Sequence, residues 1–180
     1  MENKIIIICK SSTGFTKKYA SLISRKTGAR LVDFKEASPE LMSGCDLVIF
    51  GSRAHAGRID GYKKIREMFH KSTARRFLLF VTGATPAAAS GTINEFWAQN
   101  LTEEELADIP HFYMPGGLCY EKMSLSDRLM MKVAAKMMKK KKNKTAQDLE
   151  FERAISSSYD ISDKAYAEPL IAFLSSIRES

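Results

Sequence analysis

The sequence predicts an α/β fold in which a five-stranded parallel sheet is covered by helices on both faces. Short apolar runs bounded by polar loops are typical of buried parallel strands. Segments with helical spacing of apolar residues separate these runs, and this alternation favours a doubly wound, three-layer arrangement. The length of 180 residues suits one domain with a sizeable core.

The expected strands are the apolar runs 4–9, 29–34, 46–51, 76–81 and 111–114. The expected helices are one that carries Tyr19, Ala20, Leu22 and Ile23, one over 61–71, one or two within 92–107, and one after Pro169. We expect residues 1–180 to form a single domain with a basic loop-helix insertion at about 118–145.

A hydroxyl-rich turn directly follows the first expected strand and opens a helix. It reads Ser11, Ser12, Thr13, Gly14, Phe15, Thr16. A helix N-terminus offers unpaired N–H groups and the positive end of a dipole, so it suits an anion such as phosphate. A hydroxyl-rich helix cap without any ligand is the alternative interpretation.

Several phosphate-binding classes are excluded by the residues of this turn. It lacks the G-x-x-x-x-G-K-[ST] string of a P-loop and the three glycines of a dinucleotide fingerprint. A small tyrosine phosphatase would pair Cys9 with an arginine at position 15, where this chain has Phe15. Without Lys or Arg inside the turn, it suits a held phosphomonoester better than a transferred phosphoryl group.

The turn resembles the FMN-phosphate loop of flavodoxins, whose pattern [ST]-x-T-G-x-T is matched by Ser11, Thr13, Gly14 and Thr16. The resemblance implies the strand order 2-1-3-4-5 and FMN as cofactor. It also implies that the loops after the third and fourth strands enclose the isoalloxazine ring. The ring residues expected from it are Ala54, His55, Ala56, Gly57, Thr82, Gly83, Ala84 and Thr85.

No catalytic residue can be assigned from the sequence. His55 is either a solvent-facing loop imidazole or a flavin contact. Arg53 and Arg58 are expected to be charges at the rim of the site. The three histidines and three cysteines are dispersed and contain no C-x-x-C, so we expect reduced thiols and no metal site.

Positive charge is concentrated in residues 122–144, which hold nine Lys or Arg and one acid, while the whole chain has a net charge of +7. Ser124 is expected to cap a helix with Asp127 at its third position. The interpretations left open are a core-packed helix with a solvated lysine tail, an anionic membrane surface and a protein groove. Nucleic acid is not expected as a partner, because the lysine run lacks stacking aromatics.

Two segments, 114–120 and 125–132, resemble the flavodoxin-domain branch that contains menaquinone-dependent protoporphyrinogen oxidase. From the family we expect an FMN-binding oxidoreductase that passes electrons between a donor or substrate and a quinone-type or protein acceptor, with NAD(P)H as a candidate donor. A non-enzymatic electron carrier is the alternative. With no signal peptide and no apolar run long enough to span a bilayer, we expect a cytoplasmic protein, or one at the inner face of the membrane.

Overall fold

The computed structural model describes residues 4–179, without the side chains of 147, 150, 178 and 179. Contacts within the chain divide it into two compact units. The larger unit comprises residues 1–116 and 161–180, and the smaller unit comprises residues 117–160. The expectation of a single domain with an insertion stays a prediction.

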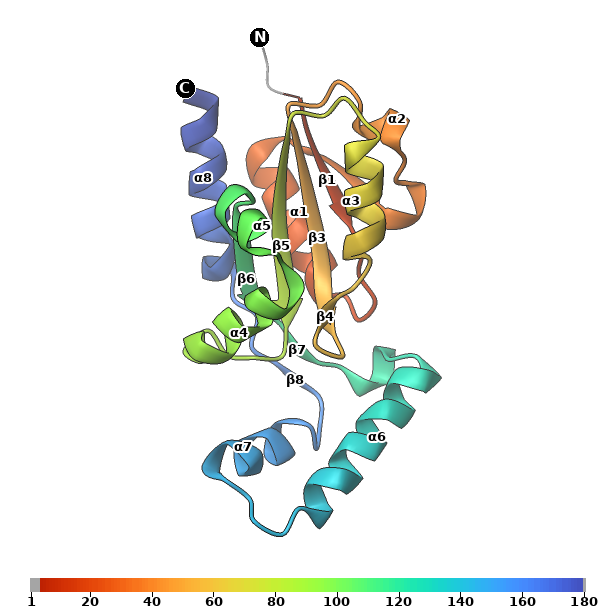
Figure 1. Ribbon diagram of the computed structural model, residues 1–180, viewed down its shortest axis with the longest axis vertical. Helices are drawn as coiled ribbons and strands as arrows, with labels where there is room; N and C mark the ends of the chain where they lie inside the picture. The colour runs from red at the N-terminus through yellow and green to blue at the C-terminus, as the bar shows by residue number, and fades with distance from the viewer. Residues whose placement is uncertain (1–3, 180) are drawn as a thin grey trace. The chain divides into compact units, whose positions relative to one another are not determined.

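The larger unit contains a sheet of five parallel strands with a short antiparallel strand at one end (Figure 1). Its strands are β1 (Ile5–Cys9), β2 (Arg30–Asp33), β3 (Leu47–His55), β4 (Arg58–Ile59), β5 (Arg76–Gly83) and β6 (His111–Pro115). Their order is β2-β1-β3-β5-β6, and β4 pairs with β3. Counted without β4, this is the expected order 2-1-3-4-5, so the predicted fold class is confirmed.

Helices cover both faces of this sheet. They are α1 (Phe15–Thr27), α2 (Pro39–Met42), α3 (Tyr62–His70), α4 (Ser90–Asn100), α5 (Glu103–Asp108) and α8 (Glu168–Glu179), with short turns η1 (Phe34–Glu36) and η3 (Lys164–Ala167). α1 and α8 pack on one face, where Tyr19, Ile23 and Leu170 are buried. α2, α3 and α4 pack on the other face, where Ile65 and Trp97 are buried. Figure 1 shows α8 and α3 on opposite sides of the sheet.

The buried apolar runs explain why these strands form the centre of the sheet. Ile7 and Ile8 of β1 are fully buried on opposite faces, and Ile49 and Phe50 of β3 repeat the pattern. A strand with apolar side chains on both faces is stable only between two helical layers. The sequence signal of an unbroken apolar run therefore predicted these strands correctly.

Two expectations about local structure are refined. The third strand was expected to end at Gly51, but β3 continues to His55 and returns through β4 as a hairpin. The segment 92–107 contains two helices, because Leu101 ends α4 and Thr102 begins α5 with a capping box to Glu105.

The smaller unit contains two helices and a two-stranded antiparallel ribbon. Its elements are β7 (Gly117–Leu118), η2 (Tyr120–Lys122), α6 (Leu125–Lys140), α7 (Ala146–Ala154) and β8 (Tyr159–Asp160). Ser124 caps α6 by accepting a hydrogen bond from the Asp127 N–H, as predicted. The second helix, α7, was not predicted from the sequence.

Candidate functional site

Three loops of the larger unit meet at the carboxyl edge of the sheet, after β1, β3 and β5. Cys9 is level with Gly51, and Arg53 is level with Thr82, so the ends of these parallel strands are in register. β2 and β3 lie on opposite sides of β1, which makes this edge the point where the strand order reverses. Ligands of open α/β sheets bind at this place.

The first loop joins β1 to the start of α1 and leaves backbone N–H groups available. Gly14 precedes the helix with a φ of 101°, a conformation that favours glycine, and no side chain caps the helix. Among the described residues, none accepts a hydrogen bond from the N–H groups of residues 13–16. The Lys17 N–H points to Ser11 Oγ at 3.3 Å. The loop therefore offers an anion the donors that helix starts leave unsatisfied.

A buried hydroxyl chain connects the three loops. Thr16 Oγ1 and Thr82 Oγ1 are 2.8 Å apart, and the Thr82 hydroxyl also lies 3.4 Å from the carbonyl oxygen of Ser52. If Thr82 donates to this carbonyl, Thr16 must donate to Thr82. In that arrangement the Thr16 hydroxyl ties the loops together, and its proton is not available to an anion.

The second loop is the turn of the β3–β4 hairpin. Ala54 pairs with Ile59 and His55 pairs with Arg58, so Ala56 and Gly57 form a two-residue loop. Both have positive φ, 49° and 74°, as the tight type I′ hairpin turn requires. The turn residues are exposed, while Ala54 and His55 are half-buried.

Asp60 fixes the base of this hairpin. Its N–H donates to the Arg53 carbonyl at 3.1 Å, and its carboxylate accepts from Arg53 Nε at 3.1 Å. Lys10 Nζ lies 3.6 Å from the same carboxylate, and Ser52 Oγ donates to the Asp60 carbonyl. Lys10, Arg53 and the Asp60 carboxylate thus form a charged cluster at the edge of the site.

Asn100, the last residue of α4, fixes the tip of the hairpin. Its amide nitrogen donates to the Gly57 carbonyl at 2.9 Å, and its amide oxygen accepts from the Ile59 N–H at 3.0 Å. The Arg58 guanidinium donates to the Gln99 carbonyl at 2.8 Å. Arg58, expected to be a rim charge, therefore also anchors the hairpin to α4.

The third loop begins at the end of β5 and is supported by Tyr113 of β6. The Thr85 N–H donates to Tyr113 Oη at 3.1 Å. A Cβ atom at Gly83 would lie 2.2 Å from the same oxygen, so only glycine fits at this position. Burial raises the pKa of the Tyr113 hydroxyl, which keeps it neutral and able to bond this loop.

The predicted site residues thus gather at one edge of the sheet. Ser11, Ser12, Thr13 and Gly14 lie in the first loop, Phe15 and Thr16 begin α1, Ala54, His55, Ala56 and Gly57 form the hairpin end, and Thr82, Gly83, Ala84 and Thr85 end or follow β5. The sequence analysis missed Asp60, Asn100 and Tyr113, which hold these loops. Each acts across a long sequence separation, so no local pattern marks it.

Cys9 is a core residue. It lies at the end of β1 and is 5% exposed. Burial raises the pKa of its thiol to about 12, with a smaller contribution from the Asp33 carboxylate. A thiol that stays protonated is a poor nucleophile. Cys9 therefore fills the core and does not act as a nucleophile.

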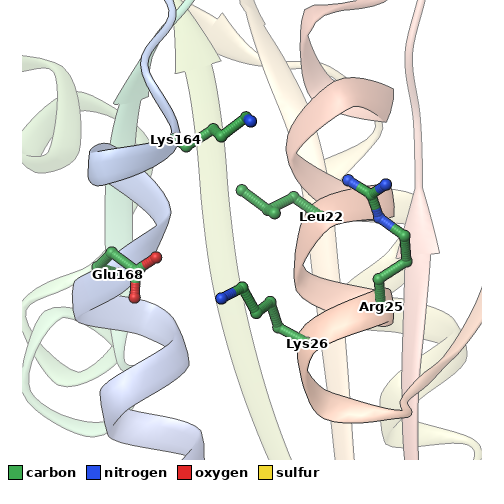
Figure 2. A pocket seen from close by; sticks show the side chains of 5 residues that line it. All are labelled: Leu22, Arg25, Lys26, Lys164 and Glu168. Atoms are coloured by element: carbon green, nitrogen blue, oxygen red, sulfur yellow. The ribbon is translucent and has the colours of Figure 1, made fainter.

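A shallow pocket of about 340 Å³ lies elsewhere, between the second half of α1 and the segment that starts α8 (Figure 2). It is lined by Leu22, Arg25, Lys26, Lys164 and Glu168. Its lining is charged and open, and none of the three loops contributes to it. We therefore place the candidate site at the carboxyl edge of the sheet.

Comparison with protein families matches residues 6–145 to the family described as the flavodoxin domain. The chain belongs to the flavodoxin domain family. The fold of this family implies a flavin cofactor, for which FMN is typical, and a redox role. A comparison with curated proteins gave no match. Over residues 4–179, no helix has the length and apolar character needed to cross a membrane.

Solved structures similar to this chain include flavodoxins. The flavodoxin, WrbA-like protein from Agrobacterium tumefaciens is 15% identical, with a TM-score of 0.41 over 86% of this chain and 96% of that chain. Smu.1420 from Streptococcus mutans is 14% identical, with a TM-score of 0.45 over 73% and 96%. The two-electron reduced flavodoxin of Megasphaera elsdenii is 14% identical, with a TM-score of 0.40 over 61% and 82%.

Proposed function

We propose that this flavodoxin-domain protein binds FMN at the carboxyl edge of its sheet and acts as an oxidoreductase. The observation that carries the proposal is the available set of N–H groups of residues 13–16 at the start of α1. Together with the helix dipole, they would hold the phosphate group. Ser11 and Thr13 would add hydroxyl donors, and Gly14 allows the backbone to approach closely.

The ring would lie between the hairpin end, 54–57, and the loop 82–85. Both segments consist of small residues apart from His55, so a flat ring can approach their backbones. Asn100 holds the first segment and Tyr113 holds the second, so neither must be ordered when the ligand binds. Bound FMN would supply the electron chemistry, and these residues would position it.

The charge distribution favours an oxidoreductase over an electron carrier. A carrier of the acidic type needs an acidic docking face, whereas this chain has a net charge of +7. Lys10 and Arg53 lie at the edge of the site, both beside the Asp60 carboxylate. This arrangement would attract an anionic electron donor, such as NAD(P)H, or an anionic substrate.

We further propose that the chain lies near the branch that contains menaquinone-dependent protoporphyrinogen oxidase. In support, the smaller unit is inserted between β6 and α8, directly after Gly116, as an added element of that branch would be. A quinone is then the acceptor of first choice. We assign no residue to a porphyrin site.

Titration with FMN and with riboflavin tests the binding site. Riboflavin has the same ring and lacks the phosphate, so it is a matched control ligand. We expect FMN fluorescence to be quenched and FMN to bind at least about tenfold more tightly, because riboflavin cannot use the N–H groups at the helix start. Equal affinities would show that the phosphate loop is not used.

Steady-state turnover distinguishes an enzyme from a carrier. FMN-loaded protein is mixed with NADH or NADPH and a soluble menaquinone analogue, and quinone reduction is followed. We expect multiple turnovers, and a higher KM for the nucleotide in Lys10→Gln than in the control Lys63→Gln, which removes an exposed charge from α3. A single turnover, without catalysis by either nucleotide, would support the carrier instead.

A further inference from the structure

The exposed apolar side chains of the protein are concentrated in its smaller unit. Among the described residues, seven large apolar side chains are exposed, and all seven belong to residues 117–160. They are Leu125, Leu129, Met130, Val133, Met137, Leu149 and Phe151. Exposed large apolar side chains gathered in one part of a molecule are typical of an interaction site.

Five of these residues form one outward strip on α6, which we call the α6 strip: Leu125, Leu129, Met130, Val133 and Met137. At 3.6 residues per turn they span an arc of roughly 140°. Leu125 is 84% exposed and Met137 is 69% exposed, so both ends of the strip are open.

The α6 strip is distinct from the face that packs within the smaller unit. Met131, Ala134, Ala135 and Met138 are half-buried on the other side of α6, and α6 contacts α7. The unit therefore has its own apolar packing and does not use the α6 strip for it. This differs from the interpretation as a core-packed helix, in which the whole apolar set would be buried.

Lysines overlap one side of the α6 strip: by helical geometry Lys136 and Lys140 lie within its arc, and Lys132 and Lys139 lie just outside it. Lys132, Lys136, Lys139 and Lys140 are exposed, and none forms an ion pair with a residue that the structure describes. By contrast, two lysines after the helix are already paired with α7, in Lys141–Asp148 and Lys144–Glu152, both at 2.6 Å. The uncompensated positive charge therefore lies within and beside the apolar strip.

We propose that the α6 strip and the lysines within and beside it dock onto an anionic lipid surface. A helix with one apolar face and adjacent lysines lies in the plane of the membrane interface, with the apolar face inserted and the cations at the headgroups. A second copy of this chain is a poor occupant, because residues 122–144 have a net charge of +8 and two copies would repel each other. The proposal does not depend on flavin binding.

Co-sedimentation of the full-length protein with vesicles tests this docking. We expect binding to an equal mixture of phosphatidylglycerol and phosphatidylcholine, and at least about tenfold weaker binding to phosphatidylcholine alone. Higher salt should weaken the binding, because it screens the lysines from the headgroups.

Two pairs of substitutions separate the apolar part of the contact from the electrostatic part. Leu129→Ser with Val133→Ser should weaken binding at least about tenfold, because both side chains would otherwise be inserted. Lys132→Gln with Lys136→Gln should weaken it roughly 25-fold, since each basic residue contributes about fivefold. The same charge change at exposed positions of the larger unit, Lys63→Gln with Lys71→Gln, is the matched control and should have no such effect.

A tryptophan in the α6 strip gives an independent measurement of insertion. The emission of Leu129→Trp should shift to the blue on anionic vesicles, while Trp97 of the parent protein is buried and should not respond. The proposal is wrong if the parent protein stays in solution with anionic vesicles, or if the serine pair binds as the parent does. It is also wrong if the parent is a dimer that the serine pair dissociates, because the α6 strip is then a subunit interface.

Discussion

Asn100 should control the stability of the hairpin that borders the candidate site. Its amide nitrogen donates to the Gly57 carbonyl and to the Phe96 carbonyl, and its amide oxygen accepts from the Ile59 N–H. A net hydrogen bond contributes about 1 kcal/mol, so Asn100→Ala should lower the free energy of unfolding by about 3 kcal/mol. With a urea m-value of about 2 kcal/mol/M, the midpoint of unfolding should fall by about 1.5 M.

The neighbouring residue provides a matched control for this experiment. Gln99→Ala removes an exposed side chain, and the Gln99 carbonyl that accepts from Arg58 is retained. We expect urea unfolding of this variant to follow the parent protein. Asn100→Ala should also weaken FMN binding several-fold, because the hairpin must then be ordered by the ligand. If Asn100→Ala unfolds at the parent midpoint, the amide does not hold the hairpin and the reasoning is refuted.

Three further predictions concern the residues around the site. Gly83→Ala should lower the free energy of unfolding by about 1–3 kcal/mol in thermal melts, because its Cβ would overlap Tyr113 Oη. Adding Tyr113→Phe to this variant should recover part of the lost stability. Thr16→Val and Thr82→Val should each destabilise the protein, and a double-mutant cycle should give a coupling energy of about 1 kcal/mol or more. Additive effects of the two substitutions would show that the two hydroxyls do not interact. The raised pKa of Cys9 favours the neutral thiol in the folded state, so the free energy of unfolding should fall as pH rises above 9, the ordinary pKa of a thiol. In urea titrations, the free energy of unfolding of Cys9→Ala should fall less steeply over the same pH range.

The parts of the fold that the sequence predicted are those with a local cause. Residues 4–9 and 46–51 form unbroken apolar runs, and such a run can be buried only between two layers of helices. The hydroxyl-rich turn at 11–16 follows the first run immediately, so its position at the edge of the sheet was predictable. The strand order came from the resemblance to flavodoxins, since apolar runs do not reveal which strands are neighbours.

The parts that were not predicted depend on contacts between distant segments. The hairpin at 54–59 lacks alternating apolar residues, and its turn has Ala56 where glycine or asparagine would have signalled it. Asn100 contacts Gly57 from 43 residues away, and nothing around it in the sequence marks this role. On α6, helical spacing predicted the helix but could not tell which of its two apolar faces would be covered.

The visible absorption spectrum of the purified protein, before and after FMN is added and the excess removed, tests the central claim most directly. We expect the absorption bands of a bound, oxidised flavin, which remain with the protein through gel filtration. A protein that stays colourless after incubation with FMN would contradict the assignment of the carboxyl edge as a flavin site.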